Sequence, residues 1–315
     1  MADCSNEFSE FHETIKLTAT KRQSLRHSRD AIRDRIKAHF GDDMETEAPS
    51  FRGQGSYAMA TIVNPISGEF DIDDGVYLKN LDTDKTKWPT TATVHNWIYK
   101  AVDGQTNEKP TDKNKCIRVV YAGQYHVDLP IYGLYNDLVY LAVKDDGWTV
   151  SDPQAITDWF LESAKNHGDQ LRRIVRYIKA WADYKSGSLP SGLVLTVLVV
   201  DNFSGAESDD VSFADTIKKI QAQLAVSSVI YNPVDAGELL SDGVSETQLG
   251  NLKNGLSVLA STASKALADP DVVTACERWK KVFGDRFPNA SAAKSEAIYA
   301  SAPAVISGGA PPWAH

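Results

Sequence analysis

The chain has 315 residues, of which 42% are hydrophobic and 24% charged, the proportions of a folded globular protein. This length predicts roughly two domains, or one large domain with an elaboration. The 33 Lys and Arg residues are outnumbered by 42 Asp and Glu residues, which gives a net charge of −9. Such an acidic chain is unsuited to long nucleic-acid backbones, whose binding depends on many basic contacts, but it can still bind small anions at a local basic patch.

Residues 1–10 have neither the basic nor the apolar region of a secretory signal. The longest aliphatic-rich run, Leu193–Val200, is far too short to cross a membrane. The three cysteines, Cys4, Cys116 and Cys276, are widely spaced and contain no CxxC pair. We therefore expect free thiols, a cytoplasmic location and no membrane partner.

The first half of the chain mixes helical and strand-like patterns. Apolar residues at helical spacing among many charges predict one long surface helix over the first forty residues, ended by Gly41 and Asp42. A polar stretch at 43–50 and the segment FRGQGSYAMATIV follow. We then expect strands at 70–78, 116–122, 125–132 and 138–143, with a helix at 88–102.

After Trp148 we expect helices only. Asp152-Pro153 is typical of a helix start. Further helices are predicted at 169–185, 191–202 and 212–226, after a capping box at 245–248, and between Asp269-Pro270 and Gly284. The predicted organisation is a mixed α/β part at 1–165, a helical part at 166–300 and a flexible tail at 301–315.

Three acidic residues fall on predicted strands. In FDIDDGVYL, alternation places Asp71 and Asp73 on the face opposite the apolar residues. In YHVDLPIY, Asp128 lies opposite an apolar face, together with His126, for which pairing or packing is a better role than metal ligation. A solvated surface explains most isolated acidic pairs, but three carboxylates on adjacent strands would repel each other unless a cation compensates them. Oxygen-only ligands are typical of Mg²⁺.

A glycine-rich segment precedes these acids. Residues 53–58 fit a relaxed GxGxxA dinucleotide fingerprint, but the buried apolar strand that should precede it is missing. A Gly55-Ser56 turn that opens a short helix would instead offer free backbone N–H groups to a phosphate. A phosphate cradle followed by paired carboxylates is typical of phosphoryl or nucleotidyl transfer with two metal ions.

Together, GQGSYAMATIV, FDIDDGVYL and YHVDLPIY resemble the polymerase-β-like nucleotidyltransferase superfamily. Within it, the chain is most similar to bacterial cGAS/DncV-like nucleotidyltransferases (CD-NTases), which make cyclic oligonucleotide signals in anti-phage (CBASS) defence. The resemblance is dense over 51–132 and continues in outline to about 203. It implies a two-lobed α/β (α+β) fold with a mixed sheet, a long N-terminal spine helix and a C-terminal helical lobe.

The resemblance also implies site residues and cofactors. Asp71, Asp73 and Asp128 match the catalytic, metal-binding triad, which implies two Mg²⁺ ions that Mn²⁺ can replace. The phosphate-contacting residues of the family match Gln54, Gly55 and Ser56, and its triphosphate-contacting residues match Lys179 and Ser191.

The predicted helix at 169–185 carries a basic stripe of Arg172, Arg176 and Lys179 at helical spacing. This stripe is either an ordinary solvated helix face or a triphosphate clamp that faces the metal site. Tyr57 is a candidate for stacking on a base, although packing suits that residue better. At the start of the next helix the family often has an aromatic residue that stacks on a base, but here Gly192 and Leu193 stand instead, which leaves the base pocket unassigned.

The resemblance implies an enzyme that joins ATP and GTP, with release of pyrophosphate, into a cyclic dinucleotide similar to cGAMP. It further implies a downstream effector activated by the product, no nucleic-acid template, and a regulatory or conjugating partner at the C-terminus. Two alternatives stay open: a small-molecule or RNA-directed nucleotidyltransferase with a linear product, and a catalytically inactive nucleotide-binding scaffold.

Overall fold

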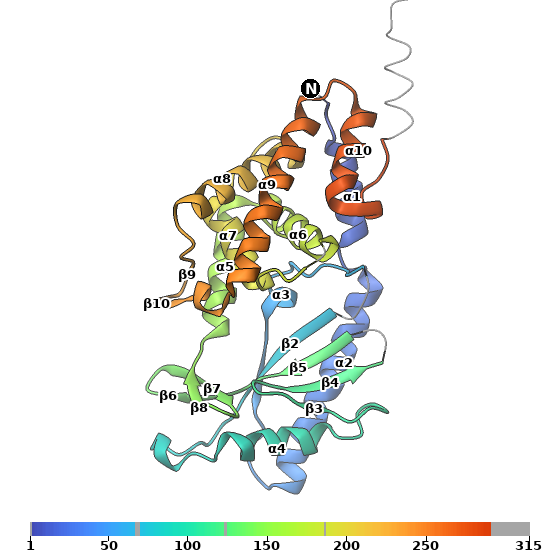
Figure 1. Cartoon of the computed structure of the whole chain (residues 1–315). Coiled ribbons are helices and arrows are strands. Elements are labelled where there is room, and N and C mark those ends of the chain that lie inside the picture. Colours follow the sequence, from blue (N-terminus) through green and yellow to red (C-terminus); the bar gives the residue numbers. More distant parts are fainter. Residues whose placement is uncertain (1, 67–69, 123–124, 186, 291–315) are drawn as a thin grey trace, which may run out of the picture.

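The computed structural model describes residues 2–66, 70–122, 125–185 and 187–290, which form two lobes with separate hydrophobic cores (Figure 1). The strands are β1 (Ser50–Gln54), β2 (Phe70–Tyr77), β3 (Thr111–Asp112), β4 (Ile117–Tyr121), β5 (Tyr125–Leu129), β6 (Ile131–Tyr135), β7 (Leu138–Val143), β8 (Gly147–Val150), β9 (Tyr231–Asn232) and β10 (Asp235–Leu239). The α-helices are α1 (Ser5–Ile15), α2 (Ala19–Ala38), α3 (Gly55–Ala58), α4 (Thr91–Val102), α5 (Pro153–His167), α6 (Asp169–Tyr184), α7 (Gly192–Asn202), α8 (Asp209–Val226), α9 (Glu246–Ala268) and α10 (Val272–Phe283). Short helical turns are η1 (His39–Asp43), η2 (Lys85–Lys87), η3 (Leu240–Gly243) and η4 (Gly284–Arg286).

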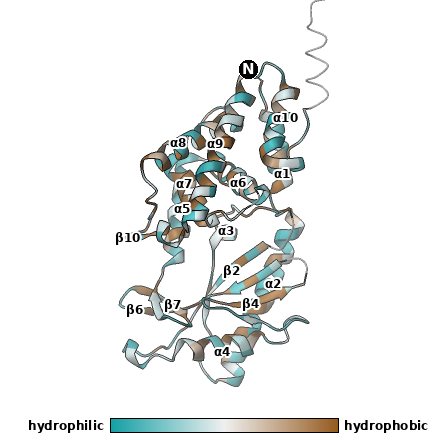
Figure 2. Cartoon of the chain, in the orientation of Figure 1, coloured by the Kyte–Doolittle hydropathy of each residue, from teal (hydrophilic) through white to brown (hydrophobic). Residues whose placement is uncertain are grey.

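The sheet lobe is built around β2. The strand order is β3-β4-β5-β2-β6-β7-β8, and β1 pairs with β2. Strand β2 runs parallel to β5 and β6 and antiparallel to β1, so the sheet is mixed, as predicted. Helices α2 and α4 contribute residues to its hydrophobic core. In Figure 2, α2 carries both hydrophobic and hydrophilic residues.

Two strand predictions were wrong in detail. The predicted run at 125–132 is two strands, because Pro130 has no N–H to donate and separates β5 from β6. Strand β2 pairs with β5 in its first half and with β6 near its end.

The expectation of no strands after Trp148 was also wrong, because β9 and β10 form a small antiparallel pair in the helical part. That pair is short and largely exposed, so it lacks the apolar alternation that marks a strand.

The predicted spine helix is broken into α1 and α2. The backbone of Lys16 is extended and forms a β-bridge with Val63. The Thr18 side chain then caps α2 by accepting a hydrogen bond from the Lys21 backbone N–H. The apolar residues of α1 belong to the core of the helical lobe, and those of α2 to the core of the sheet lobe. The two helices therefore still link the lobes, but with a joint where the sequence predicted a continuous helix.

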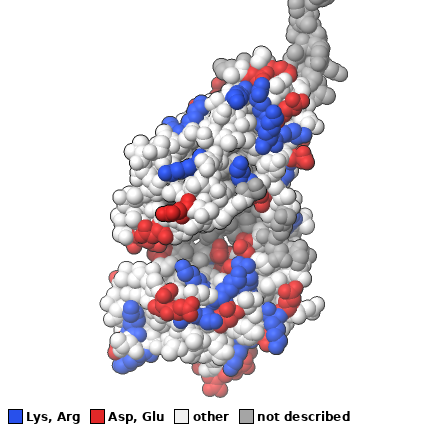
Figure 3. All heavy atoms as spheres, viewed as in Figure 1, with Lys and Arg blue, Asp and Glu red and all other residues white. Residues whose placement is uncertain are grey.

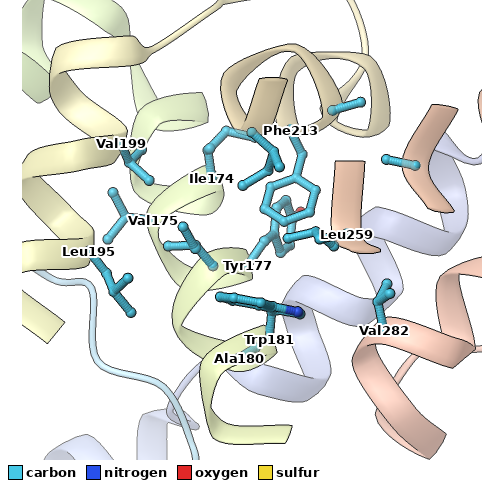
Figure 4. Packing of buried hydrophobic residues seen from close by; sticks show 14 of the residues in the cluster. Ile174, Val175, Tyr177, Ala180, Trp181, Leu195, Val199, Phe213, Leu259 and Val282 are labelled. Atoms are coloured by element: carbon cyan, nitrogen blue, oxygen red, sulfur yellow. The ribbon is translucent and has the colours of Figure 1, made fainter. Parts of the chain in front are cut away.

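Helix α6 forms the centre of the helical lobe. Figure 4 shows Tyr177 and Trp181 of α6 surrounded by side chains of α7, α8, α9 and α10. Several predicted helix ends are confirmed, namely the Asp152 cap with Pro153, the capping box of Ser245 and the closing Gly284. Helix α10 begins two residues later than predicted, because Asp271 rather than Asp269 caps it.

The three cysteines are free, as predicted, and the structure shows that they are buried. None of the helices in the described residues has the length and hydrophobicity of a transmembrane span. The predicted tail at 301–315 lies outside the described residues.

Candidate active site

A tight turn joins β1 to the short helix α3, as the Gly-Ser motif predicted. Gly55 has a φ of +66°, and a Cβ atom at this position would lie 2.3 Å from Asp73 Oδ2. Only glycine combines this left-handed backbone with such a close approach. The turn therefore places the backbone of Gly55 and Ser56 directly beside the acidic strand.

The sheet brings the three predicted acids together. Asp73 of β2 lies opposite Asp128 of β5 in the parallel register, and Asp71 lies two residues earlier on β2. Gln54 of β1 is opposite Asp73 on the other edge of β2. Burial, and then the negative charges of Asp128 and Asp71, raise the pKa of Asp73 to about 7. The pattern of alternating strand residues thus predicted a real cluster of carboxylates.

Arg118 of β4 is a site residue that the sequence analysis missed. Its Nε and Nη2 each donate to one oxygen of Asp128 at 2.7 Å, and Nη2 lies 3.4 Å from Asp71 Oδ1. Hydrogen bonding to Asp128 raises the pKa of the Arg118 guanidinium. The only sequence signal was one arginine within the apolar run CIRVVYA, next to the strand of Asp128. Arg118 offsets part of the charge of the triad.

The donor set of the triad fits a hard divalent cation. It consists of carboxylate oxygens alone, the ligands that Mg²⁺ and Mn²⁺ prefer. Among the described residues, no Lys or Arg forms an ion pair with Asp73, so its charge is left for another cation to balance. Arg118 already holds both oxygens of Asp128, and a cation would have to use their remaining lone pairs.

A cavity of about 460 Å³ lies between the turn, two of the acids (Asp71 and Asp73) and the helical lobe, whereas Asp128 does not line it. It is lined by Gln54, Gly55, Ser56, Met59, Thr61, Ile62, Asp71, Asp73, Pro153, Ile156, Lys179, Gly192, Leu193 and Thr196. Figure 3 shows a groove across the molecule between the two lobes, with acidic and basic residues along its edges. The cavity combines polar groups at the sheet side with an apolar wall from α5 and α7.

Lys179 is the one residue of the predicted basic stripe that reaches this cavity. Its Nζ donates to Thr61 Oγ1 at 3.1 Å, which ties α6 to the segment after α3. Burial and the nearby charge of Arg176 lower the pKa of Lys179 to about 8. Ser191 caps α7 through the Val194 backbone N–H and directly precedes the lining residue Gly192.

Of the remaining predicted residues, Gln54 lines the cavity, whereas Tyr57 and Arg176 do not. Gln54 is buried and donates to the Tyr132 hydroxyl at 3.0 Å, while its Oε1 has no hydrogen-bond partner among the described residues. Tyr57 packs against the core of the sheet lobe and does not line the cavity. Arg176 is buried, lines a different cavity and donates to the Ala60 carbonyl oxygen, so it is not part of the predicted triphosphate clamp.

Comparison with known proteins identifies the central segment. Residues 49–132 match the family model of the DncV-like nucleotidyltransferase domain of cyclic GMP-AMP synthase. A cyclic GMP-AMP synthase of Escherichia albertii is 30% identical over 223 residues, covering 67% of this chain and 48% of that protein. A cyclic AMP-AMP-AMP synthase of an Acinetobacter species is 28% identical over 157 residues, covering 47% of this chain and 46% of that protein. The chain thus spans about half the length of these relatives.

The fold of the chain also matches that of solved DncV structures. The crystal structure of Vibrio cholerae DncV cyclic AMP-GMP synthase, described as a prokaryotic cGAS homolog, superposes with a TM-score of 0.75 at 20% identity. The match covers 88% of this chain and 93% of that chain. An Escherichia coli DncV structure with bound 3'-deoxy GTP gives a TM-score of 0.73 at 20% identity and covers 88% of this chain and 94% of that one. The predicted two-lobed polymerase-β-like fold is therefore confirmed.

Proposed function

Because the chain carries a cGAS/DncV-like nucleotidyltransferase domain within the two-lobed fold of these enzymes, we propose that it is a cyclic oligonucleotide synthase. It transfers nucleotidyl groups from ATP and GTP to a nucleotide hydroxyl and releases pyrophosphate. The observation that carries the proposal is the shared cavity, where Asp71 and Asp73 face the Gly55-Ser56 turn and Lys179. This combination supplies a metal site, a phosphate-binding turn and a cation for the donor triphosphate.

In this proposal the donor triphosphate lies between the turn and Lys179. The backbone of Gly55 and Ser56 approaches it from the sheet lobe, and the ammonium of Lys179 from the helical lobe. Ser191 lies at the start of α7, beside the cavity wall, and adds a hydroxyl. The base then rests against apolar residues such as Ile156 and Leu193, which contribute area but few hydrogen bonds.

Asp71, Asp73 and Asp128 would hold the divalent cations, with Mg²⁺ as the expected ion and Mn²⁺ as a substitute. Two such ions, when bound, lower the pKa of an attacking hydroxyl and stabilise the charge on the leaving pyrophosphate. Asp73, whose pKa is raised by burial and then by the neighbouring carboxylates, needs that positive charge to stay ionised. Arg118 holds the Asp128 carboxylate in place through two hydrogen bonds across the β4–β5 pair.

The test is product analysis. The purified chain is incubated with all four NTPs and Mg²⁺ or Mn²⁺, the products are treated with phosphatase, and resistant species are identified by mass spectrometry. We expect pyrophosphate release and a phosphatase-resistant dinucleotide built from ATP and GTP, with a trinucleotide as the second expectation. Asp73→Ala and excess EDTA are matched controls, and each should abolish the product.

The alternatives give different results in the same assay. A linear, phosphatase-sensitive product would identify a small-molecule or RNA-directed nucleotidyltransferase, and nucleotide binding without turnover would identify an inactive scaffold. Full activity of Asp73→Ala would refute the assigned site. A cyclic product would in turn support a cytoplasmic role in anti-phage signalling through a downstream effector. The proposed regulatory or conjugating partner at the C-terminus concerns residues outside the described ranges.

A further inference from the structure

A second cavity, of about 760 Å³, lies on the other side of the Gly-Ser segment from the candidate active site. Residues of the segment 54–62 line both cavities. Ser56, Met59 and Thr61 line the active-site cavity, whereas Ala58 and Ala60 line the second one. The segment after α3 is thus a thin wall between the two spaces. We call the second space the rear cavity.

The basic side chains of α6 are divided between the two cavities in the same way. Lys179 lines the active-site cavity, while Arg172, Arg173 and Arg176 line the rear cavity. Lys16, at the joint between α1 and α2, and Arg22 of α2 add two more basic residues to the rear cavity. The basic stripe of the sequence therefore serves two spaces, and its two other members, Arg172 and Arg176, face away from the acidic triad.

Five Lys and Arg residues line the rear cavity but only three acidic ones, Asp169, Glu207 and Asp209, so part of its positive charge is unbalanced. Asp209 pairs with Arg173 at 2.6 Å, and Asp169 pairs with Arg172 at 2.8 Å. In the described part of the chain, neither Arg22 nor Arg176 forms an ion pair with a carboxylate. Burial, and then the charges of Arg22 and Arg172, lower the pKa of Arg176 to about 10. The arginines face one another closely enough to repel.

Two of these arginines also have a buried N–H group without a hydrogen-bond partner among the described residues. Arg176 is only 7% exposed, and its Nε–H finds no partner among the described residues. The Arg172 Nε–H is likewise buried and unsatisfied. Arg176 is held in place by His12 Nε2, at 2.7 Å from Nη1, and by the Ala60 carbonyl oxygen. Burial lowers the pKa of His12 to about 4, so this histidine accepts a hydrogen bond as a neutral ring. A neutral acceptor does not compensate a guanidinium charge.

We propose that the rear cavity binds a small molecule that carries two or more phosphate charges, with Arg22, Arg172 and Arg176 as its main contacts. Guanidinium groups match phosphate oxygens in a bidentate fork, and three of them on two helices suit a ligand with more than one phosphate. The volume admits a nucleoside di- or triphosphate as well as inorganic pyrophosphate. Most lining residues are polar or charged, with Ala58, Ala60 and Leu161 as the apolar ones, and this favours recognition through the phosphates.

The test is calorimetric titration of the full chain in EDTA with inorganic pyrophosphate, and separately with ATP. EDTA removes divalent cations, and a Lys179→Ala background removes the cationic contact of the active-site cavity. We expect pyrophosphate to bind Lys179→Ala at one site. Adding Arg22→Ala and Arg172→Ala should weaken this binding at least tenfold, whereas the Arg22→Lys and Arg172→Lys pair should retain part of it. Arg176 is left intact because it also supports the Ala60 segment.

A matched control removes two charges elsewhere. Lys85→Ala and Lys87→Ala lie on η2 of the sheet lobe and should leave the affinity unchanged. Pyrophosphate that fails to bind Lys179→Ala, or binds equally well after loss of Arg22 and Arg172, would overturn the proposal. If ATP binds at least as tightly as pyrophosphate at this site, the ligand is a nucleotide; the reverse order identifies a free polyphosphate. These measurements of binding do not require turnover, so their outcome is independent of whether the proposed synthase activity is confirmed.

Discussion

Gly55→Ala is the sharpest perturbation of the candidate site, because both the backbone and a neighbour exclude a side chain there. The φ of +66° costs an alanine about 1–2 kcal/mol. The new Cβ would lie 2.3 Å from Asp73 Oδ2 and 3.3 Å from its Cγ, and such overpacking typically costs about 1–3 kcal/mol more. We therefore expect the free energy of unfolding to fall by about 2–5 kcal/mol.

The effect on catalysis should be larger than the effect on stability. To make room for the methyl group, the Asp73 carboxylate must move away from residue 55, and misplacement of a catalytic group by about 1 Å can cost on the order of 100-fold in rate. Equilibrium urea unfolding measures the first effect, and initial rates of pyrophosphate release measure the second, under conditions in which the variant is folded.

Gly53→Ala is the matched control. Gly53 lies on the same strand, its φ is not in the left-handed region, and a Cβ atom there would meet nothing within 4 Å. We expect a change of less than about 1 kcal/mol and nearly unchanged activity. Equal activity of the folded Gly55→Ala and Gly53→Ala variants would show that the position of Asp73 beside the turn does not matter, and our account of the site would be wrong.

Three further predictions follow from the same geometry. Lys179→Ala should raise the KM for the donor NTP by about 10- to 150-fold, more than Ser191→Ala, and the wild-type KM should rise above pH 8 as the ammonium loses its proton. Metal-free stability should fall as pH rises from about 4 through 7, because folding raises the pKa of Asp73; thermal melts of Asp73→Asn should match wild type near pH 4 and exceed it at pH 8. Ser245→Ala breaks the capping box of α9 and should cost about 1 kcal/mol in urea unfolding without changing turnover.

The features that the sequence predicted correctly depend on a few neighbouring residues. The capping box at Ser245 and the Asp152-Pro153 helix start follow from hydrogen bonds within one turn of helix. Alternation in FDIDDGVYL fixes the face on which Asp71 and Asp73 lie, whatever the rest of the chain does. The Gly-Ser turn was also predictable, because a left-handed residue next to a crowded strand requires glycine.

The features that it did not predict depend on distant partners. The break between α1 and α2 arises because Lys16 pairs with Val63, about fifty residues away, and nothing in the helical periodicity of the first forty residues indicates it. The basic stripe on α6 was read as a single surface because its residues share one face of a helix. Residues 58–60 meet that face and divide it, which places Lys179 and Arg176 in different cavities.

Arg118 shows the same limit at the centre of the site. An arginine inside an apolar strand is unusual, but its partner cannot be known until the pairing of β4 with β5 places it opposite Asp128. The acidic triad is therefore not a set of three bare carboxylates, as the motifs alone suggested. One of the three is already matched by a guanidinium, whereas Asp73 forms no ion pair among the described residues, and burial, followed by the charges of Asp128 and Asp71, raises its pKa. We therefore expect the metal ion to be needed most at β2, next to the Gly55-Ser56 turn where we propose that the phosphates bind.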